Sequence, residues 1–159
     1  DKLHLEKASD IGEILILVLE LKKRDFDSKI IEAIAKQNPH ELVFILGYQN
    51  QRQLALYHGK LYRSEWMDKR DVNLCAKGFS ISDIWDSLIE QVALTEENTV
   101  SQGLSVDERL VRQDKIKKLT KLVNETETSA WKEQQPKKQF ELYQRVQVYK
   151  KELEEIING

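Results

Sequence analysis

Two contrasting patterns of apolar and polar positions divide the chain. Residues 14–21 form a run of large aliphatic side chains interrupted only by Glu20, which is typical of a strand covered on both faces. In the last third of the chain, apolar residues recur at steps of three and four between charged residues, which predicts helices with one apolar stripe. These patterns predict a small α+β domain with a helical extension, and they predict residues 14–21 as a central strand.

The signals for a helix and a second strand follow this first strand. Asp27 is a candidate cap for a helix whose apolar face includes Ile31 and Ile34, and Pro39 ends that helix. A second apolar strand is predicted at residues 42–46. Because a strand, a helix and a strand follow one another at this spacing, we expect a right-handed parallel crossover.

Shorter strands and one more helix complete the predicted first domain. Polar turns at residues 49–51 and 58–59 separate three strands that we expect to form a meander. Ser80 and Asp83 then form a capping box, with Phe79 expected to pack as a hydrophobic staple against the helix. The helix that follows is amphipathic, so we expect it to cover one face of the sheet.

The helical extension carries two matched series of apolar positions on either side of Pro136. Each series steps by three and four residues, and the two members of each pair lie equally far from the proline. Because proline disrupts a continuous helix, we expect an antiparallel helical hairpin of roughly 40 Å. The alternative is one long kinked helix that dimerises, so self-association stays possible. The two series are Ile116, Leu119, Val123, Thr126 and Ala130, and Leu142, Val146, Tyr149, Leu153 and Ile156.

The predicted domain boundaries follow from these patterns. We expect an α+β domain over residues 1–95, a linker over 96–104 and a coiled-coil-like helical hairpin over 105–159. The predicted fold class is therefore α+β, with a small mixed sheet, packed helices and a C-terminal antiparallel helical hairpin. The chain begins at Asp1 and its one methionine is Met67, so we expect the first domain to lack its native N-terminal part.

Composition and charge narrow the classes of function. The 25 basic residues nearly balance the 27 acidic ones, so the overall charge gives no reason to expect nucleic-acid binding. No apolar run approaches the roughly 20 residues that span a bilayer, which excludes a membrane-spanning helix. The single cysteine cannot form an internal disulfide, and no charged leader with an apolar segment is present. We therefore expect a cytoplasmic protein.

Four short stretches carry a resemblance to a known family. They are Glu-Leu-Lys at residues 20–22, Leu-Tyr-Arg-Ser-Glu-Trp at 61–66, Lys-Lys-Gln-Phe-Glu-Leu at 137–142 and Lys-Lys-Glu-Leu at 150–153. With these stretches the chain resembles domain-of-unknown-function family 4391 over nearly its whole length. The resemblance implies a gene context of helicases and DNA methyltransferases in restriction-like or phage-defence clusters. It implies no established reaction and no catalytic residue.

Glu20 and Lys22 are the candidate catalytic residues. They form an E-x-K pair at a strand end, and restriction-type nucleases place a metal-binding carboxylate and a catalytic lysine in this way. Such a site needs a second carboxylate nearby, but Asp10 lies roughly 33 Å away if the strand is continuous. Glu41 lies at the far end of the second strand. An acid from a missing N-terminal part could complete the site, whereas a polar strand end at a solvated turn is the simpler interpretation.

The remaining residues that could carry chemistry are dispersed along the chain. The histidines and the cysteine lack the paired spacing of a zinc site, and no glycine-rich phosphate loop is present. We therefore expect no metal and no cofactor, and enzymatic activity stays uncertain, with the sequence leaning against it. The residues are His4, His40, His58 and Cys75.

Aromatic and basic residues of the hairpin are the candidate binding residues. Trp131 and Phe140 flank its turn, where large aromatic side chains either close the hairpin or dock a protein partner. Residues 105–159 hold twelve basic and ten acidic residues, so a solvated face explains the lysines better than phosphate contacts do. The lysines that could contact nucleic acid are Lys117, Lys118, Lys121, Lys137 and Lys138.

Two functional hypotheses follow. The first is a non-catalytic accessory or assembly module of a restriction-like or phage-defence complex, which docks a helicase or DNA methyltransferase component through its helical hairpin. The alternative is a nucleic-acid-binding or nuclease-like subunit with a degenerate or incomplete E-x-K site.

Overall fold

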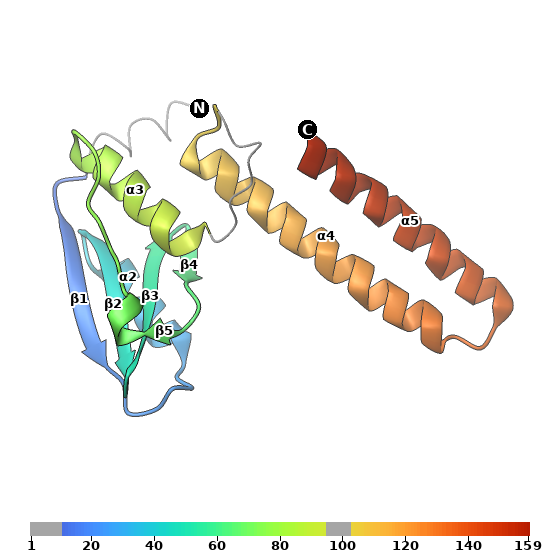
Figure 1. Cartoon of the computed structure of the whole chain (residues 1–159), viewed down its shortest axis with the longest axis horizontal. Helices are drawn as coiled ribbons and strands as arrows, with labels where there is room; N and C mark the ends of the chain where they lie inside the picture. The colour runs from blue at the N-terminus through green and yellow to red at the C-terminus, as the bar shows by residue number, and fades with distance from the viewer. Residues whose placement is uncertain (1–10, 95–102) are drawn as a thin grey trace. The chain divides into compact units, whose positions relative to one another are not determined.

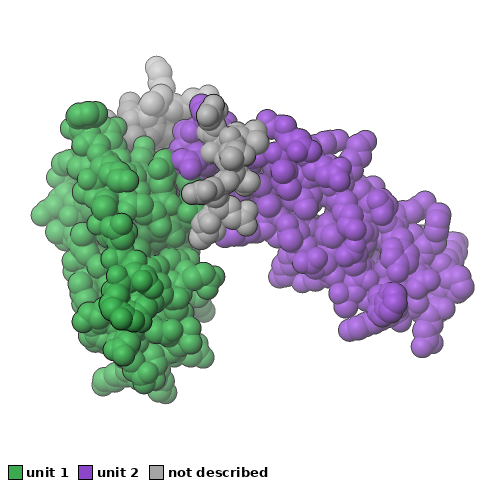
Figure 2. Space-filling view, viewed as in Figure 1, with its two compact units in different colours: residues 1–96 green, residues 97–159 purple. Residues whose placement is uncertain are grey.

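The computed structural model describes residues 11–94 and 103–159, and the chain divides into two compact units, residues 1–96 and 97–159 (Figure 2). The linker predicted at residues 96–104 lies mostly outside the described residues. The first unit contains, in chain order, β1 (Ile14–Glu20), α2 (Ser28–Gln37), β2 (Glu41–Tyr48), β3 (Gln51–His58), β4 (Lys60–Arg63), β5 (Met67–Asp68), a short 3-10 helix (Lys69–Asp71) and α3 (Ile81–Ala93) (Figure 1). The second unit contains α4 (Val106–Lys132) and α5 (Pro136–Asn158).

The sheet of the first unit is mixed, as the sequence predicts. Its strand order is β1-β2-β3-β4, and β5 pairs with β3 beyond this path. β1 and β2 are parallel and are connected through α2, whereas β2, β3 and β4 form an antiparallel meander. The Asp27 carboxylate accepts a hydrogen bond from the Lys29 amide at 3.0 Å, which caps α2. The structure therefore confirms the parallel pairing of the predicted crossover and the meander.

The position of β1 differs from the sequence prediction of a central strand. Among the described strands it lies at the edge of the sheet. Its leucines pack on the core beside Ile31 of α2, but Ile16 and Val18 on its other face stay exposed. α3 packs against β3 and β4 rather than across β1. An all-aliphatic run thus indicates a strand, but it does not determine which face another layer covers.

The core of the first unit lies on both faces of the two middle strands. Phe44, Leu46 and Ala55 are fully buried with Ile31 on the α2 side. On α3, the predicted apolar side chains of Trp85, Leu88, Ile89 and Val92 are buried and that of Ile84 is half-buried, whereas that of Ile81 is 42% exposed. The Ser80–Asp83 capping box is present. The predicted staple at Phe79 is wrong, because that side chain is fully exposed. The Asp83 carboxylate instead binds the backbone amides of residues 79 and 80, which satisfies the helix start without an apolar contact.

The second unit is an antiparallel pair of helices, α4 and α5, packed along each other. Pro136 is the first residue of α5, so the chain reverses where the sequence predicts. All ten apolar positions of the two predicted series are buried or half-buried, and Val123, Ala130 and Val146 are the most buried of them. The hairpin is therefore confirmed, and periodicity alone located its inner stripe. None of the described helices is long and apolar enough to cross a membrane.

Candidate functional site

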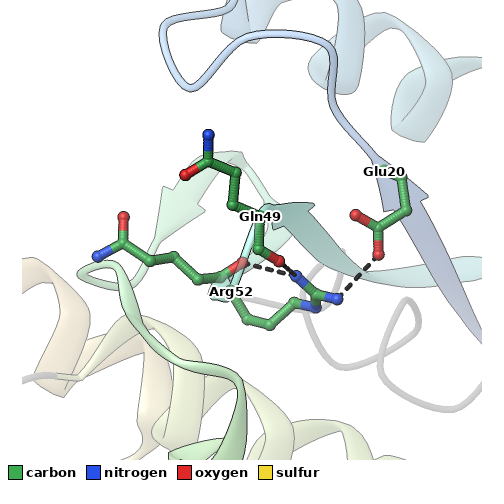
Figure 3. Close-up of polar contacts among 4 residues, drawn as sticks. Glu20, Gln49 and Arg52 are labelled. Carbon is green, nitrogen blue, oxygen red and sulfur yellow. Dashed lines mark hydrogen bonds and ion pairs between the residues drawn. The ribbon is translucent and has the colours of Figure 1, made fainter.

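Glu20 belongs to a row of three residues that crosses the sheet at the end of β1. The strand register places Glu20 beside Gly47 of β2 and Gly47 beside Arg52 of β3. Gly47 has no side chain, so the outer two residues meet over it. An Arg52 guanidinium N–H donates to the Glu20 carboxylate at 2.9 Å (Figure 3). Two side chains 32 residues apart are thereby joined across the strand between them.

Backbone carbonyls hold the Arg52 side chain in place in addition to this ion pair. Its guanidinium also donates to the backbone carbonyls of Gln49 and Gln51, at 3.0 and 2.8 Å (Figure 3). The Arg52 side chain is 9% exposed, whereas that of Glu20 is 64% exposed. A buried guanidinium without an anionic partner is unfavourable, so one role of Glu20 is to neutralise Arg52.

The E-x-K pair therefore lies beside an arginine that sequence reasoning did not identify. Lys22 is exposed just beyond the end of β1. Glu41 pairs in register with Ile14, six residues from Glu20, which places the two carboxyl groups about 20 Å apart along the strands. Asp10 lies outside the described residues. Within the described residues, no three His, Cys, Asp or Glu side chains are placed to hold a metal ion.

A second polar pair lies at the opposite end of the middle strands. Burial raises the pKa of the half-buried Glu41 carboxyl above its ordinary value, and the nearby His58 partly offsets this rise. The His58 ring contacts Trp85 of α3 edge to face, with 6.4 Å between the ring centroids. His40 and Cys75 lie on other segments, and His4 lies outside the described residues.

The tip of the hairpin exposes the two aromatic residues that the sequence singles out. Trp131 in the last turn of α4 is 81% exposed, and Phe140 in the first turns of α5 is 63% exposed. Neither side chain closes the hairpin. Gln139 performs that role, because its side-chain amide donates to the carbonyls of Ala130 and Glu133 at 3.0 and 3.3 Å. The aromatic pair thus projects from a turn that other groups hold in place.

The five candidate lysines for nucleic-acid contact are all exposed, but they do not share one segment. Lys117, Lys118 and Lys121 lie within α4, and Lys121 lies 3.7 Å from the Glu125 carboxylate. The other two, residues 137 and 138, lie in the first turn of α5. This distribution does not bring the five together in one patch beside the aromatic residues.

Gly47 and Arg52 are the residues of this site that sequence reasoning missed. A glycine inside a strand is a known sign of close approach by another group, but the predicted strand ended at residue 46, whereas β2 includes Gly47. Nothing local to Arg52 pointed to Glu20, because their meeting depends on the register of three strands.

A family model described as domain of unknown function 4391 matches residues 1–153. The match covers nearly the whole chain, so the chain belongs to this family. Comparison with curated proteins and with solved structures finds no match.

Proposed function

We propose that this member of the family is a non-catalytic accessory module that docks a larger protein through the tip of its helical hairpin. The observation that carries the proposal is the exposure of Trp131 and Phe140 beside a turn that the Gln139 amide holds closed. Large aromatic side chains on a rigid support lose little conformational freedom on binding, and they dominate the energetics of many protein interfaces.

The packing of the hairpin supports a docking role. The ten positions of the inner stripe are already buried or half-buried between α4 and α5, so the exposed aromatic residues are not needed for that stripe. The charges of residues 105–159 nearly balance, which favours a protein surface over a nucleic-acid backbone as the partner. The partner class comes from the family resemblance: a helicase or DNA methyltransferase component of a restriction-like or phage-defence complex.

The geometry of the E-x-K pair favours this proposal over a nuclease-like subunit. Glu20 is engaged with Arg52, and Glu41 lies at the other end of the strands. Metal-dependent cleavage of DNA or RNA that is lost in both Glu20→Ala and Lys22→Ala would refute a non-catalytic role.

The test uses the full chain and purified helicase and DNA methyltransferase components of the kind that the family resemblance implies. Binding of each component is measured by surface plasmon resonance with native protein, Trp131→Ala and Phe140→Ala. If these residues are interface hot spots, each substitution costs about 2 kcal/mol or more, which weakens binding roughly 30-fold. Phe79→Ala is the matched control, because Phe79 is a fully exposed phenylalanine of the first unit.

Two results contradict the proposal. If both tip variants bind the component as tightly as native protein, the tip is not the docking surface. If only nucleic acid binds, with a steep salt dependence that weakens when Lys117, Lys118 and Lys121 are neutralised, the alternative nucleic-acid-binding function is correct. Sedimentation velocity of the native chain and the two tip variants separates docking of a partner from self-association.

A further inference from the structure

A cleft of about 520 Å³ opens on the first unit, and its lining does not include Glu20, Gly47 or Arg52. The segment after β1, the start of β3 and the segment after β4 form its walls. Its volume falls within the roughly 300–1,000 Å³ of small-molecule sites. Its lining includes Arg24, Phe26, Gln53, Arg63, Ser64 and Trp66.

Gln53 lines this cleft, and one of its buried side-chain atoms has no hydrogen-bond partner among the described residues. Its side chain is only 6% exposed, and its amide N–H donates to the Ser64 carbonyl at 2.8 Å. The other half of the amide, Oε1, accepts no hydrogen bond from any residue in the described parts of the chain. Because a buried carbonyl oxygen without a donor is unfavourable, Gln53 fits a ligand that brings an N–H or O–H group.

Two arginines and two aromatic rings form the rest of the recognition surface. The Arg24 guanidinium lies 5.5 Å from the centre of the Trp66 ring, and that of Arg63 lies 5.7 Å from the centre of the Phe26 ring. Both arginines are exposed, so they are the parts of the wall that can move to admit a ligand group to Gln53.

The contacts between the arginines and the aromatic rings are weak enough for a flat, anionic ligand to replace them. At exposed sites a cation–π contact is weaker than the stacking of a base on an aromatic side chain. A base that takes the place of Arg24 over Trp66 also frees the guanidinium to bind phosphate, which is a strong charge-assisted hydrogen bond. A single ligand thus improves several contacts at once.

The charge of the cleft limits the size of the anion. Asp25 and Glu65 also line it, so two acidic residues balance the two arginines. This balance of charge disfavours the binding of a long nucleic-acid backbone with many phosphates. The two guanidinium groups can still bind a single phosphate.

We propose that this cleft binds one nucleotide unit, with the base stacked on Trp66, a base N–H donated to Gln53 Oε1, and the phosphate held by Arg24 and Arg63. A nucleotide combines the flat ring, the N–H donor and the anion in one molecule. The unit can be a free nucleotide or one residue of a single-stranded nucleic acid. This proposal does not depend on the docking function of the hairpin.

The test is isothermal titration calorimetry on the full chain. The probes are the four nucleoside 5′-monophosphates, a nucleoside, inorganic phosphate and a short single-stranded oligonucleotide. We expect at least one monophosphate to bind, and its affinity to fall about tenfold or more in Gln53→Leu, Arg24→Gln and Arg63→Gln. Arg70→Gln is the matched control, because Arg70 is an exposed arginine outside the cleft that pairs with Asp68, and it should bind like native protein.

The remaining probes separate the sources of the ligand. If the oligonucleotide binds and the same three variants weaken it, the site accepts a nucleotide within a strand, with a salt dependence corresponding to about one phosphate. If only monophosphates bind, the ligand is a free nucleotide. The exposed Arg24 and Arg63 variants keep the test decisive even if Gln53→Leu fails to fold.

Three results overturn the proposal. The first is no binding of any monophosphate or oligonucleotide at millimolar concentration. The second is binding of inorganic phosphate or of the unphosphorylated nucleoside as tightly as the monophosphate. Either result would show that the cleft does not recognise the base and the phosphate together. The third is native-like binding by a folded Gln53→Leu protein, since Oε1 would then have no ligand contact.

Discussion

Gly47→Ala should stabilise the first unit only when Glu20 is absent. A methyl group on Gly47 would lie 2.5 Å from a Glu20 carboxylate oxygen, which is closer than real carbon contacts allow. Its backbone is extended, so alanine fits there without backbone strain. The substitution must therefore displace the Glu20 side chain, and with it the ion pair to Arg52.

The magnitude follows from the exposure of the two partners. The Glu20 side chain is 64% exposed, so solvent screening limits the ion pair to about 1 kcal/mol, although Arg52 is buried. Alanine in place of a strand glycine stabilises the fold by about 0.5–1 kcal/mol, because alanine loses less backbone entropy on folding. We expect Gly47→Ala to be near neutral in native protein and stabilising by about 0.5–1 kcal/mol in a Glu20→Ala background. The effect of Gly47→Ala should thus differ by about 1 kcal/mol between the two backgrounds.

The assay is urea unfolding of the native chain, the two single variants and the double variant, followed by tryptophan fluorescence. Trp66 and Trp85 lie in the first unit, and Trp85 is buried, so they report its unfolding. A Trp131→Phe background removes the signal of the hairpin. If the effect of Gly47→Ala is the same in both backgrounds within about 0.5 kcal/mol, the side chains do not meet over Gly47 and the reasoning is wrong.

Two further predictions concern the hairpin and the second polar pair. Val146→Ala should lower the free energy of unfolding of the hairpin by about 1–3 kcal/mol, because the removed methyl groups are buried. In circular dichroism melts, the control Val148→Ala should match native protein, because Val148 is exposed. Equal losses of stability in both variants would contradict the packing of Val146. Burial raises the pKa of Glu41, against a smaller opposing effect of His58, so the folded state binds this proton more tightly than the unfolded chain. The charged carboxylate therefore destabilises the fold at neutral pH, and this penalty disappears as the pH falls through the folded pKa. Glu41→Gln should raise the urea midpoint at neutral pH and lose that advantage in acid; an advantage that grows in acid would reverse the assigned sign.

The features that could be predicted from the sequence are those that depend on residues close together in the chain. The cap at Asp27, the capping box at Ser80 and the reversal at Pro136 are each specified by residues within a few positions. The inner stripe of the hairpin was also predictable, because helical periodicity places every third or fourth side chain on one face. The exposure of Trp131 and Phe140 was one of two outcomes that the sequence left open.

The features that could not be predicted are those that depend on how distant strands and helices assemble. Whether β1 is central or at an edge depends on which layers cover it, and its aliphatic sequence is compatible with both. Glu20 meets Arg52 because two strand registers align them over Gly47, and a shift of one residue in either register would turn the side chains to opposite faces. The cleft beside Gln53 likewise combines three segments that no short-range pattern connects. Local rules therefore determined the elements and their caps, whereas long-range pairing decided which polar groups meet.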